Sequence, residues 1–246
     1  MKKYSSLFLL LFLLSCNYQF IDKPGLKGKV KKFTEYKMSI ENNVVKDTFS
    51  IMTTTYNRKG QIVDQIIELK NGETFNQDFE YDKKENLIKE ISYYDDNKIV
   101  VNYEYKDTLL IRAYSISEAD SIYTKMDEIY YYNDKNKLDS RHYSQILVSD
   151  NDTSTYNNKY FYDKNEKLNE YITQYKSISN SIFSKTKFDY NKFGLYSKTY
   201  SYNNNDKLTT TDEYKYEYDN NGSWVKKEII RNDILEYIYT RKIDYQ

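Results

Sequence analysis

Two residues in this chain belong to types that often supply a nucleophile or a general base, and each occurs only once. They are Cys16, the single cysteine, and His142, the single histidine, in S-R-H-Y-S. One cysteine excludes an intramolecular disulfide, a C-x-x-C redox pair and a thiolate metal cluster within this chain. A lone histidine on a predicted strand is most often a surface residue. We therefore predict no catalytic residue, no metal site and no cofactor.

Carboxylates are plentiful, and paired carboxylates are another route to acid–base catalysis. Asp95, Asp96 and the stretch from Asp150 lie in polar segments that predict solvated turns. The stretch from Asp150 begins like a calcium-binding loop. However, Thr155 stands where that loop needs glycine, and Phe161 where it needs a bidentate acid. We expect no calcium site, and phosphate-loop and G-x-S-x-G motifs are absent from the sequence.

The position of Cys16 points to a different chemistry. Residues 1–15 contain two lysines, an apolar run from Leu7 to Leu14 and a small residue. This pattern is typical of a secretory signal, a helical segment too short to span a membrane. The segment L-L-S-C, Leu13–Cys16, resembles the lipobox of bacterial lipoproteins. The resemblance implies that residues 1–15 are removed and that Cys16 is lipidated. The alternative is an ordinary signal peptide with a chance cysteine at the cleavage point.

Lipidation would keep the protein on a membrane, because two or more acyl chains anchor stably at about 0.8 kcal/mol per buried CH₂. Residues 16–24 would form the lipidated linker, and no later stretch is apolar enough to span a bilayer. By resemblance to lipoprotein sorting in diderm bacteria, Asn17 after the cysteine implies the outer membrane. The segment N-Y-Q-F-I-D lacks the acidic cluster of surface-exported Bacteroidetes lipoproteins, which favours the periplasmic side.

The composition excludes some partners and predicts a folded chain. Lysine plus arginine equals aspartate plus glutamate at 37 each. Losing Lys2 and Lys3 with the signal leaves 35 against 37, a net charge of −2. This balance does not indicate a nucleic-acid partner. Aromatic residues make up 17%, and 30 of them are tyrosines. Disordered chains are poor in aromatic residues, so we expect the chain to fold.

A short unit that begins with tyrosine followed by Asp or Asn recurs along the chain. The main copies are separated by 25, 24, 27, 30, 28 and 28 residues, a spacing that is typical of repeat architectures. In most copies Gly, Asn or Asp stands four residues after the tyrosine, and an apolar or aromatic residue stands six after it. These features predict a β-hairpin that turns just after each tyrosine. The main copies begin at Tyr56, Tyr81, Tyr105, Tyr132, Tyr162, Tyr190 and Tyr218, with a further copy at Tyr202. The copy at Tyr105, Y-K-D-T-L-L, is shortened and degenerate.

The strands beside these turns alternate as half-buried strands do. In D-E-Y-K-Y-E-Y-D, Tyr214 and Tyr216 fall on one face, and Lys215 and Glu217 fall on the other. The segment Y-E-Y-D-N-N-G-S-W, residues 216–224, resembles the YD repeat of RHS-type proteins. The opening strand, residues 25–36, is similar to that of repeat-bearing lipoproteins of Bacteroidetes.

The resemblance covers residues 25–246, which we take as one all-β domain. In long RHS proteins such hairpins form a hollow shell. Seven or eight hairpins are too few for that shell, so the resemblance implies an open, curved antiparallel sheet, with a rolled barrel as the alternative.

Two short segments are similar to the O-glycosylation signal of Bacteroidetes envelope proteins. They are D-T-L at Asp107–Leu109 and D-S-I at Asp120–Ile122. This resemblance implies sugars on Thr108 and Ser121.

We interpret the chain as a non-enzymatic, lipid-anchored binding or scaffolding sheet. Its tyrosines offer flat apolar area with a hydroxyl tip, suited to a glycan, a peptide or another envelope protein. Cross-strand packing alone would also explain most of these tyrosines. Two other classes stay open: an immunity or inhibitor lipoprotein against a secreted toxin, and a glycan-active enzyme, which would need a cleft with facing carboxylates.

Overall fold

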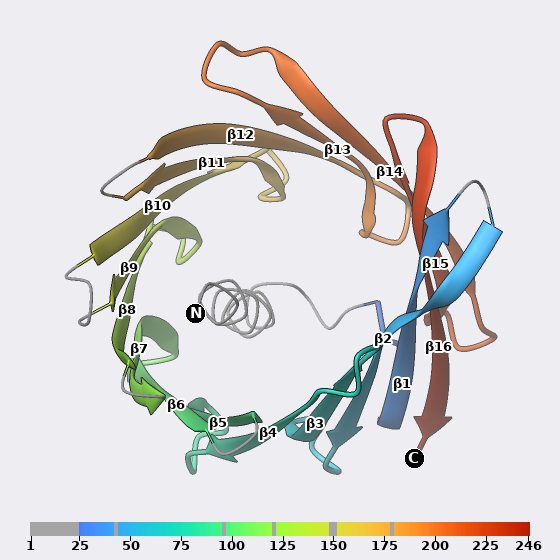
Figure 1. The fold of residues 1–246 in the computed structure, drawn as a ribbon, viewed down its shortest axis with the longest axis horizontal. Coiled ribbons are helices and arrows are strands. Elements are labelled where there is room, and N and C mark those ends of the chain that lie inside the picture. Colours follow the sequence, from blue (N-terminus) through green and yellow to red (C-terminus); the bar gives the residue numbers. More distant parts are fainter. Residues whose placement is uncertain (1–24, 42–43, 95–96, 120–121, 148–151, 178–179) are drawn as a thin grey trace.

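The computed structural model describes residues 25–41, 44–94, 97–119, 122–147, 152–177 and 180–246. This part of the chain folds into sixteen strands that form one closed barrel (Figure 1). Each strand pairs with the next in the sequence, and all pairs are antiparallel. The strands are β1 (Val30–Glu41), β2 (Val44–Tyr56), β3 (Ile62–Leu69), β4 (Thr74–Tyr81), β5 (Leu87–Tyr94), β6 (Asn97–Lys106), β7 (Leu109–Ala119), β8 (Ile122–Tyr132), β9 (Leu138–Leu147), β10 (Asp152–Tyr162), β11 (Leu168–Lys176), β12 (Ser181–Tyr190), β13 (Tyr196–Tyr202), β14 (Leu208–Tyr218), β15 (Trp224–Arg231) and β16 (Ile234–Tyr245).

Pairing of the first and last strands closes the sheet. β1 and β16 are antiparallel partners from Val30 opposite Tyr245 to Ser39 opposite Tyr237. Our leading expectation of an open sheet was therefore wrong, and the barrel alternative is confirmed. An open sheet would leave the outer edges of β1 and β16 with unpaired N–H and C=O groups, and closure removes both edges.

The segment before β1 packs against the last repeat turn and strengthens this seam. The backbone N–H of Lys27 donates to the Ser223 hydroxyl at 2.7 Å, and that of Trp224 donates to the Gly25 carbonyl at 3.3 Å. Gly25 has a φ of +63°, and a Cβ there would lie 2.3 Å from Cδ1 of Trp224. Only glycine fits this conformation and this contact.

The repeat turns form as the sequence predicts. In the seven turns whose tyrosine is followed by Asp or Asn, the side-chain oxygen of that residue accepts two backbone N–H groups, as Asp82 does from Lys84 at 2.8 Å and Asn86 at 2.9 Å. The residue four after the tyrosine has a positive φ in all seven, including Glu85 at 70° and Glu166 at 62°. The shortened turn after Tyr105 has its positive φ at Asp107 instead. The hairpin prediction is confirmed because its determinants are local.

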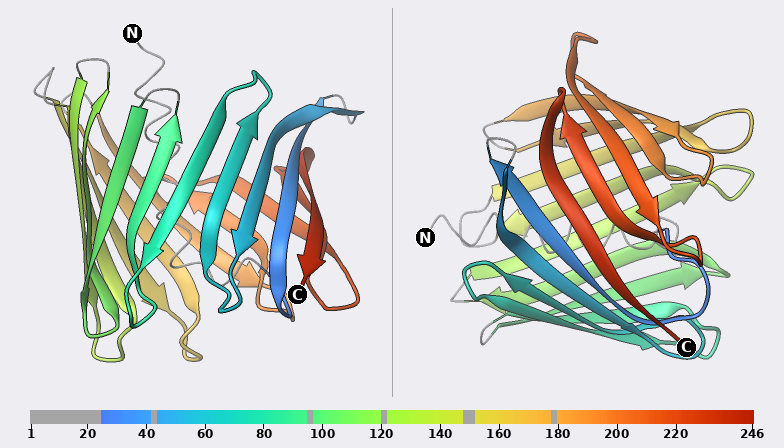
Figure 2. Two further views of the ribbon diagram at one scale, coloured as in Figure 1. Left: turned by 90° about the horizontal axis from the view of Figure 1, so that it is seen from below. Right: turned by 90° about the vertical axis from the view of Figure 1, so that its right-hand side faces the viewer.

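The turns that follow even-numbered strands all lie at one end of the barrel, where the C-terminus also lies (Figure 2). The main repeat copies all begin at this end. One repeat is long enough for two strands and the two turns that follow them, so each copy returns the chain to the same end of the barrel. The copy at Tyr202 ends β13, an odd-numbered strand, and so lies at the opposite end. The repeating unit is therefore one pair of strands.

The two faces of the wall differ in burial. Along β4, Phe75 and Gln77 are buried, whereas the alternate residues Thr74, Asn76 and Asp78 are exposed. Side chains on the concave inner face converge and cover one another, while those on the outer face spread apart. As predicted, Tyr214 and Tyr216 are more buried than Lys215 and Glu217.

Aromatic side chains fill much of the inner face. Rings from neighbouring strands contact one another, as Phe75 and Tyr94 do at 4.6 Å and Phe188 and Tyr196 at 4.8 Å between centroids. Cross-strand packing thus explains many of the tyrosines, as the simpler interpretation held.

Repeat tyrosines also connect one hairpin to the previous one. Their hydroxyls donate to the backbone carbonyl of the apolar residue six positions into the preceding copy, as Tyr162 does to Leu138 at 2.8 Å and Tyr190 to Leu168 at 2.7 Å. Phenylalanine could pack at these positions but could not make this bond.

The outer face carries rows of opposite charges on neighbouring strands. Directly opposed residues include Glu80 and Lys89, Glu104 and Arg112, Glu170 and Lys187, Lys198 and Glu213, and Glu217 and Lys226. Their nitrogen–oxygen distances are 2.9, 3.8, 3.6, 3.4 and 2.9 Å, respectively. Such cross-strand pairs contribute about 0.2–1 kcal/mol each and help to fix the register.

Candidate functional site

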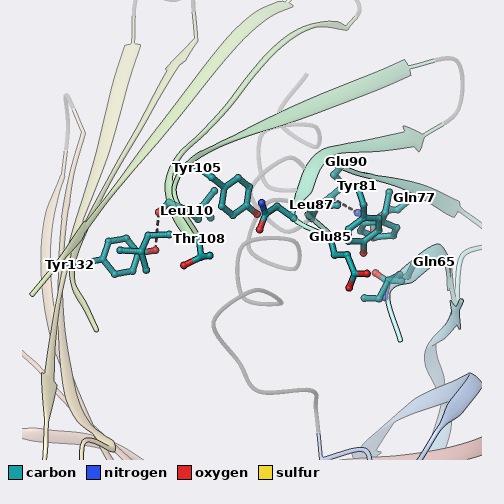
Figure 3. A pocket seen from close by; sticks show the side chains of 14 residues that line it. Gln65, Gln77, Tyr81, Glu85, Leu87, Glu90, Tyr105, Thr108, Leu110 and Tyr132 are labelled. Carbon is teal, nitrogen blue, oxygen red and sulfur yellow. Dashed lines mark hydrogen bonds between the residues drawn. The ribbon is translucent and has the colours of Figure 1, made fainter. Parts of the chain in front are cut away.

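A hollow of about 410 Å³ opens on the inner face near the end that carries the repeat turns. Its lining comes from six consecutive strands, β3 to β8, and from the turns between them (Figure 3). Side chains from six neighbouring strands can meet in one hollow only on the concave side of the wall. The lining residues are Ile62, Gln65, Gln77, Phe79, Tyr81, Glu85, Asn86, Leu87, Glu90, Tyr105, Thr108, Leu109, Leu110 and Tyr132.

Glu90 on β5 forms the polar part of this hollow. Its side chain is 3% exposed, and its two carboxyl oxygens accept hydrogen bonds from Gln77 Nε2 and from the Tyr103 hydroxyl, both at 2.9 Å. Gln77 also donates to the Ser92 hydroxyl at 3.0 Å. Burial raises the pKa of Glu90 to about 7, although the hydrogen bonds from Tyr103 and Ser92 act in the opposite direction. Near neutral pH this carboxyl is therefore partly protonated.

Eight of the fourteen lining residues are apolar or aromatic. Leu87, Leu110 and the rings of Tyr81, Tyr105 and Tyr132 line it (Figure 3). The Tyr132 hydroxyl donates to the Leu110 carbonyl at 2.8 Å, which fixes the ring against the next strand. Burial raises the pKa of Tyr81 and of Tyr132 to about 12, so both hydroxyls stay protonated at physiological pH. Such a lining suits an apolar body that carries few polar groups.

The residues singled out in the sequence are only partly brought together here. Thr108 is exposed in the short turn between β6 and β7 and lines the hollow. Glycosylation of Thr108 stays a prediction, and a sugar there would stand beside the opening. Cys16 and Ser121 lie outside the described residues, so their modification also stays a prediction.

The other candidates do not form a site in the described part of the chain. His142 is half-buried on β9, and its Nδ1 lies 2.5 Å from Oδ1 of Asn157 on the neighbouring strand. No group of three or more His, Cys, Asp or Glu side chains suited to a metal occurs among the described residues. Asp95, Asp96 and Asp150 lie outside them. The described residues also contain no helix long and apolar enough to cross a membrane.

Sequence reasoning missed Glu90 and Gln77, because a polar residue in a strand does not by itself reveal which face it occupies. A signal was nevertheless present. Lys89 pairs with Glu80 across the β4–β5 hairpin, and this places Lys89 on the outer face. Strand alternation then puts Glu90 on the inner face with Ser92.

No protein-family model matches the sequence, and no curated protein matches it. Among solved structures, a porin-like protein from Bacteroides vulgatus is similar, with a TM-score of 0.59 and 13% identity. That match covers 88% of this chain and 98% of the other. A second porin-like protein, from Bacteroides uniformis, is 14% identical over 90% of this chain and all of the other, with a TM-score of 0.38, too low to support an argument. The first likeness shows that the chain has a β-barrel fold of this kind.

Proposed function

We propose that this chain is a lipid-anchored, non-enzymatic binding protein of the bacterial cell envelope. In this proposal the barrel stands in water on the periplasmic side of the outer membrane. It takes an apolar or amphipathic small molecule into the hollow between β3 and β8. Cys16 provides the anchor, and residues 16–24 the tether.

The distribution of polarity across the wall carries this proposal. A barrel embedded in a bilayer presents an outer apolar band about 25 Å tall and usually has a polar interior. Here the outward positions of the wall include Lys89, Arg112, Lys187 and Lys226, each beside an acidic partner. A single Lys or Arg facing lipid at the bilayer midplane costs about 2–4 kcal/mol. An outer face with several such residues is suited to water.

The lipobox-like segment supplies what such a barrel would need in order to stay at a membrane. A barrel whose outer face favours water needs an anchor in order to remain attached, and a di- or triacylated cysteine anchors stably. The short, polar linker would let the barrel lie next to the membrane surface.

The hollow supports the choice of ligand. Its volume of about 410 Å³ lies within the range of small-molecule sites, and its lining is largely aromatic and apolar. Glu90 can fix the orientation of one polar group, since it lies among Gln77, Ser92 and Tyr103.

A membrane-embedded pore is the second candidate, favoured by the likeness to a porin-like barrel. It would require lipid to cover the charged outer rows described above. The immunity or inhibitor role stays a prediction that a neighbouring toxin gene would support.

Binding of a neutral apolar dye, N-phenyl-1-naphthylamine, to the full mature chain tests the proposed ligand class. We expect saturable binding that weakens by roughly tenfold when Leu87→Arg places a charge in the hollow. Ile88→Arg is the matched control, because the neighbouring Ile88 is exposed. Circular dichroism would verify that both variants fold. Dye binding that is absent in the wild type, or equal in the two variants, would contradict the proposal.

A further inference from the structure

A second cluster of polar and aromatic side chains lies on the inner face at the seam, away from the hollow. It is formed by β1, β15 and β16, the strands that close the barrel (Figure 1). We call it the seam cluster. Its members are Phe33, Glu35, Lys37, Trp224, Lys227, Tyr237, Tyr239 and Arg241.

Two lysines of the seam cluster lie over aromatic rings. Tyr239 is directly opposite Lys37 on one side and Lys227 on the other. The Lys227 ammonium lies 4.0 Å from the centroid of Tyr239 and 5.0 Å from that of Trp224. The Lys37 ammonium lies 4.1 Å from the centroid of Tyr237 and 5.8 Å from that of Tyr239. The two ammonium groups therefore approach one ring, that of Tyr239, from the strands on either side of it.

The nearby carboxylates are engaged by arginines. Glu35 Oε2 accepts a hydrogen bond from Arg241 Nε at 2.8 Å, and the Arg241 guanidinium lies 3.3 Å from the Trp224 centroid. Glu236 pairs with Arg231 at 3.0 Å. Neither Lys37 nor Lys227 lies within ion-pair distance of a carboxylate among the described residues. The two cations thus lie beside aromatic rings without an ion-pair partner among the described residues, although Glu35 raises the pKa of both lysines and Glu236 raises that of Lys37.

Burial of these cations is unfavourable unless a counter-charge is bound. Accordingly, burial lowers the pKa of Lys227 to about 8 and also lowers that of Lys37. Aromatic faces offset only part of the desolvation. An anion within reach of both ammonium groups would offset the remainder.

We propose that the seam cluster binds an oxyanion, a carboxylate or phosphate group, carried on a flat or apolar body. Lys37 and Lys227 hold the oxyanion, and the rings of Tyr237 and Tyr239 cover the body. Glu35 keeps Arg241 in place and limits the net positive charge. The proposal does not depend on ligand binding in the hollow between β3 and β8.

Such binding would depend on pH. The charged and titratable groups that face the site are Tyr214 and Tyr216 on β14, Glu35 and Lys37 on β1, Lys227 and Arg231 on β15, and Glu236, Tyr237, Tyr239 and Arg241 on β16. Among them, Lys227 is the group that loses its proton near pH 8. A bound oxyanion would stabilise its charged form, so affinity should fall as pH rises above 8 and binding near pH 8 should take up protons.

Trp224 is the only tryptophan in the chain and lies within the seam cluster, so its fluorescence reports on this site alone. The full mature chain would be titrated with phenyl phosphate, with benzoate, and with benzyl alcohol as the neutral comparison. We expect saturable changes with at least one of the two anions and none with the alcohol. The anion that binds identifies the preferred oxyanion.

Variants separate a site from non-specific quenching. Lys227→Gln and Lys37→Gln should each weaken anion binding about tenfold at pH 7, the loss of one charge-assisted contact. Lys227→Arg should keep affinity at pH 9.5, where the wild type loses it. Lys226→Gln is the matched control, because Lys226, the residue before Lys227, faces outward and pairs with Glu217 and Glu228. No saturable response to either anion, or an equal loss in the Lys226 and Lys227 variants, would overturn the proposal. The dye measurement on the hollow is unaffected by either result.

Discussion

The hollow between β3 and β8 and the seam cluster lie on the same inner face and are built on the same repeated hairpin, yet they bury opposite charges. In the hollow, the acid Glu90 has hydrogen-bond donors on both oxygens, and burial raises its pKa to about 7. At the seam, Lys227 has only aromatic faces, and burial lowers its pKa to about 8. The repeat thus fixes turns and register, while the inward positions are free to carry different chemistry.

The largest expected effect tests whether the seam is as well packed as the wall beside the hollow. Phe33 on β1 is 0% exposed and Phe75 on β4 is 2% exposed. Truncating either to alanine should cost about 3–5 kcal/mol of unfolding free energy, because each leaves a cavity. Urea unfolding of Phe33→Ala and Phe75→Ala measures this. A much smaller loss for Phe33→Ala would mean that the β1–β16 closure is weak.

Replacing Glu90 by glutamine tests the acid in the hollow. With its pKa raised, Glu90 binds more protons in the folded state than in the unfolded state between pH 4.5 and 7. Wild-type stability should therefore fall as pH rises through that window. Glu90→Gln should remove this fall and stabilise the protein by about 1–3 kcal/mol at pH 8. Thermal unfolding at pH 5 and pH 8 compares the two, and an identical pH dependence would contradict the assignment.

Replacing Lys227 by methionine tests the cation at the seam. Its lowered pKa means that the unfolded state binds more protons between about pH 8 and 10.5, so wild-type stability should rise with pH in that range. Lys227→Met should remove the rise and stabilise the protein by about 1 kcal/mol at pH 7. Lys226→Met, which breaks exposed ion pairs, should instead destabilise it by about 0–1 kcal/mol. Equal shifts in melting temperature would contradict this contrast.

The smallest effect concerns the repeat turns shared by both regions. Glu85 and Glu166 adopt φ values of 70° and 62°, which disfavour residues with a Cβ by about 1–2 kcal/mol. Replacing either by glycine relieves this strain, but it loses an exposed ion pair and makes the unfolded chain more flexible. A net gain of about 0.5 kcal/mol is expected from chemical denaturation. A clear loss at both positions would mean that the ion pairs outweigh the strain.

The sequence was informative wherever the determinants are local. Asp82 and its equivalents, the positive φ at Gly222, and the alternation of Tyr216 with Lys215 and Glu217 follow from neighbouring residues. Closure could not be predicted in this way, because Val30 and Tyr245 are far apart in sequence and their pairing depends on the curvature of the whole sheet.

The candidate sites were largely hidden in the sequence for a related reason. Glu90 and Lys227 are charged residues on strands, and a charged residue alone does not reveal which face it occupies. The outward pairs Glu80–Lys89 and Glu217–Lys226 fix that alternation, but they are recognisable only once strand register is known. Thr108 was found by its motif, yet its place beside the hollow depends on the fold.

The account rests on a barrel whose charged outer face lies in water and which is held at the membrane by Cys16. The most direct test expresses the mature chain behind an ordinary secretory signal, with Cys16→Ala, and follows it through osmotic shock and carbonate washing. We predict release as a folded, detergent-free β protein that still binds the neutral dye, while the wild type stays in the membrane fraction. A variant that remains in the outer membrane and needs detergent to be extracted would contradict the account and favour an embedded pore.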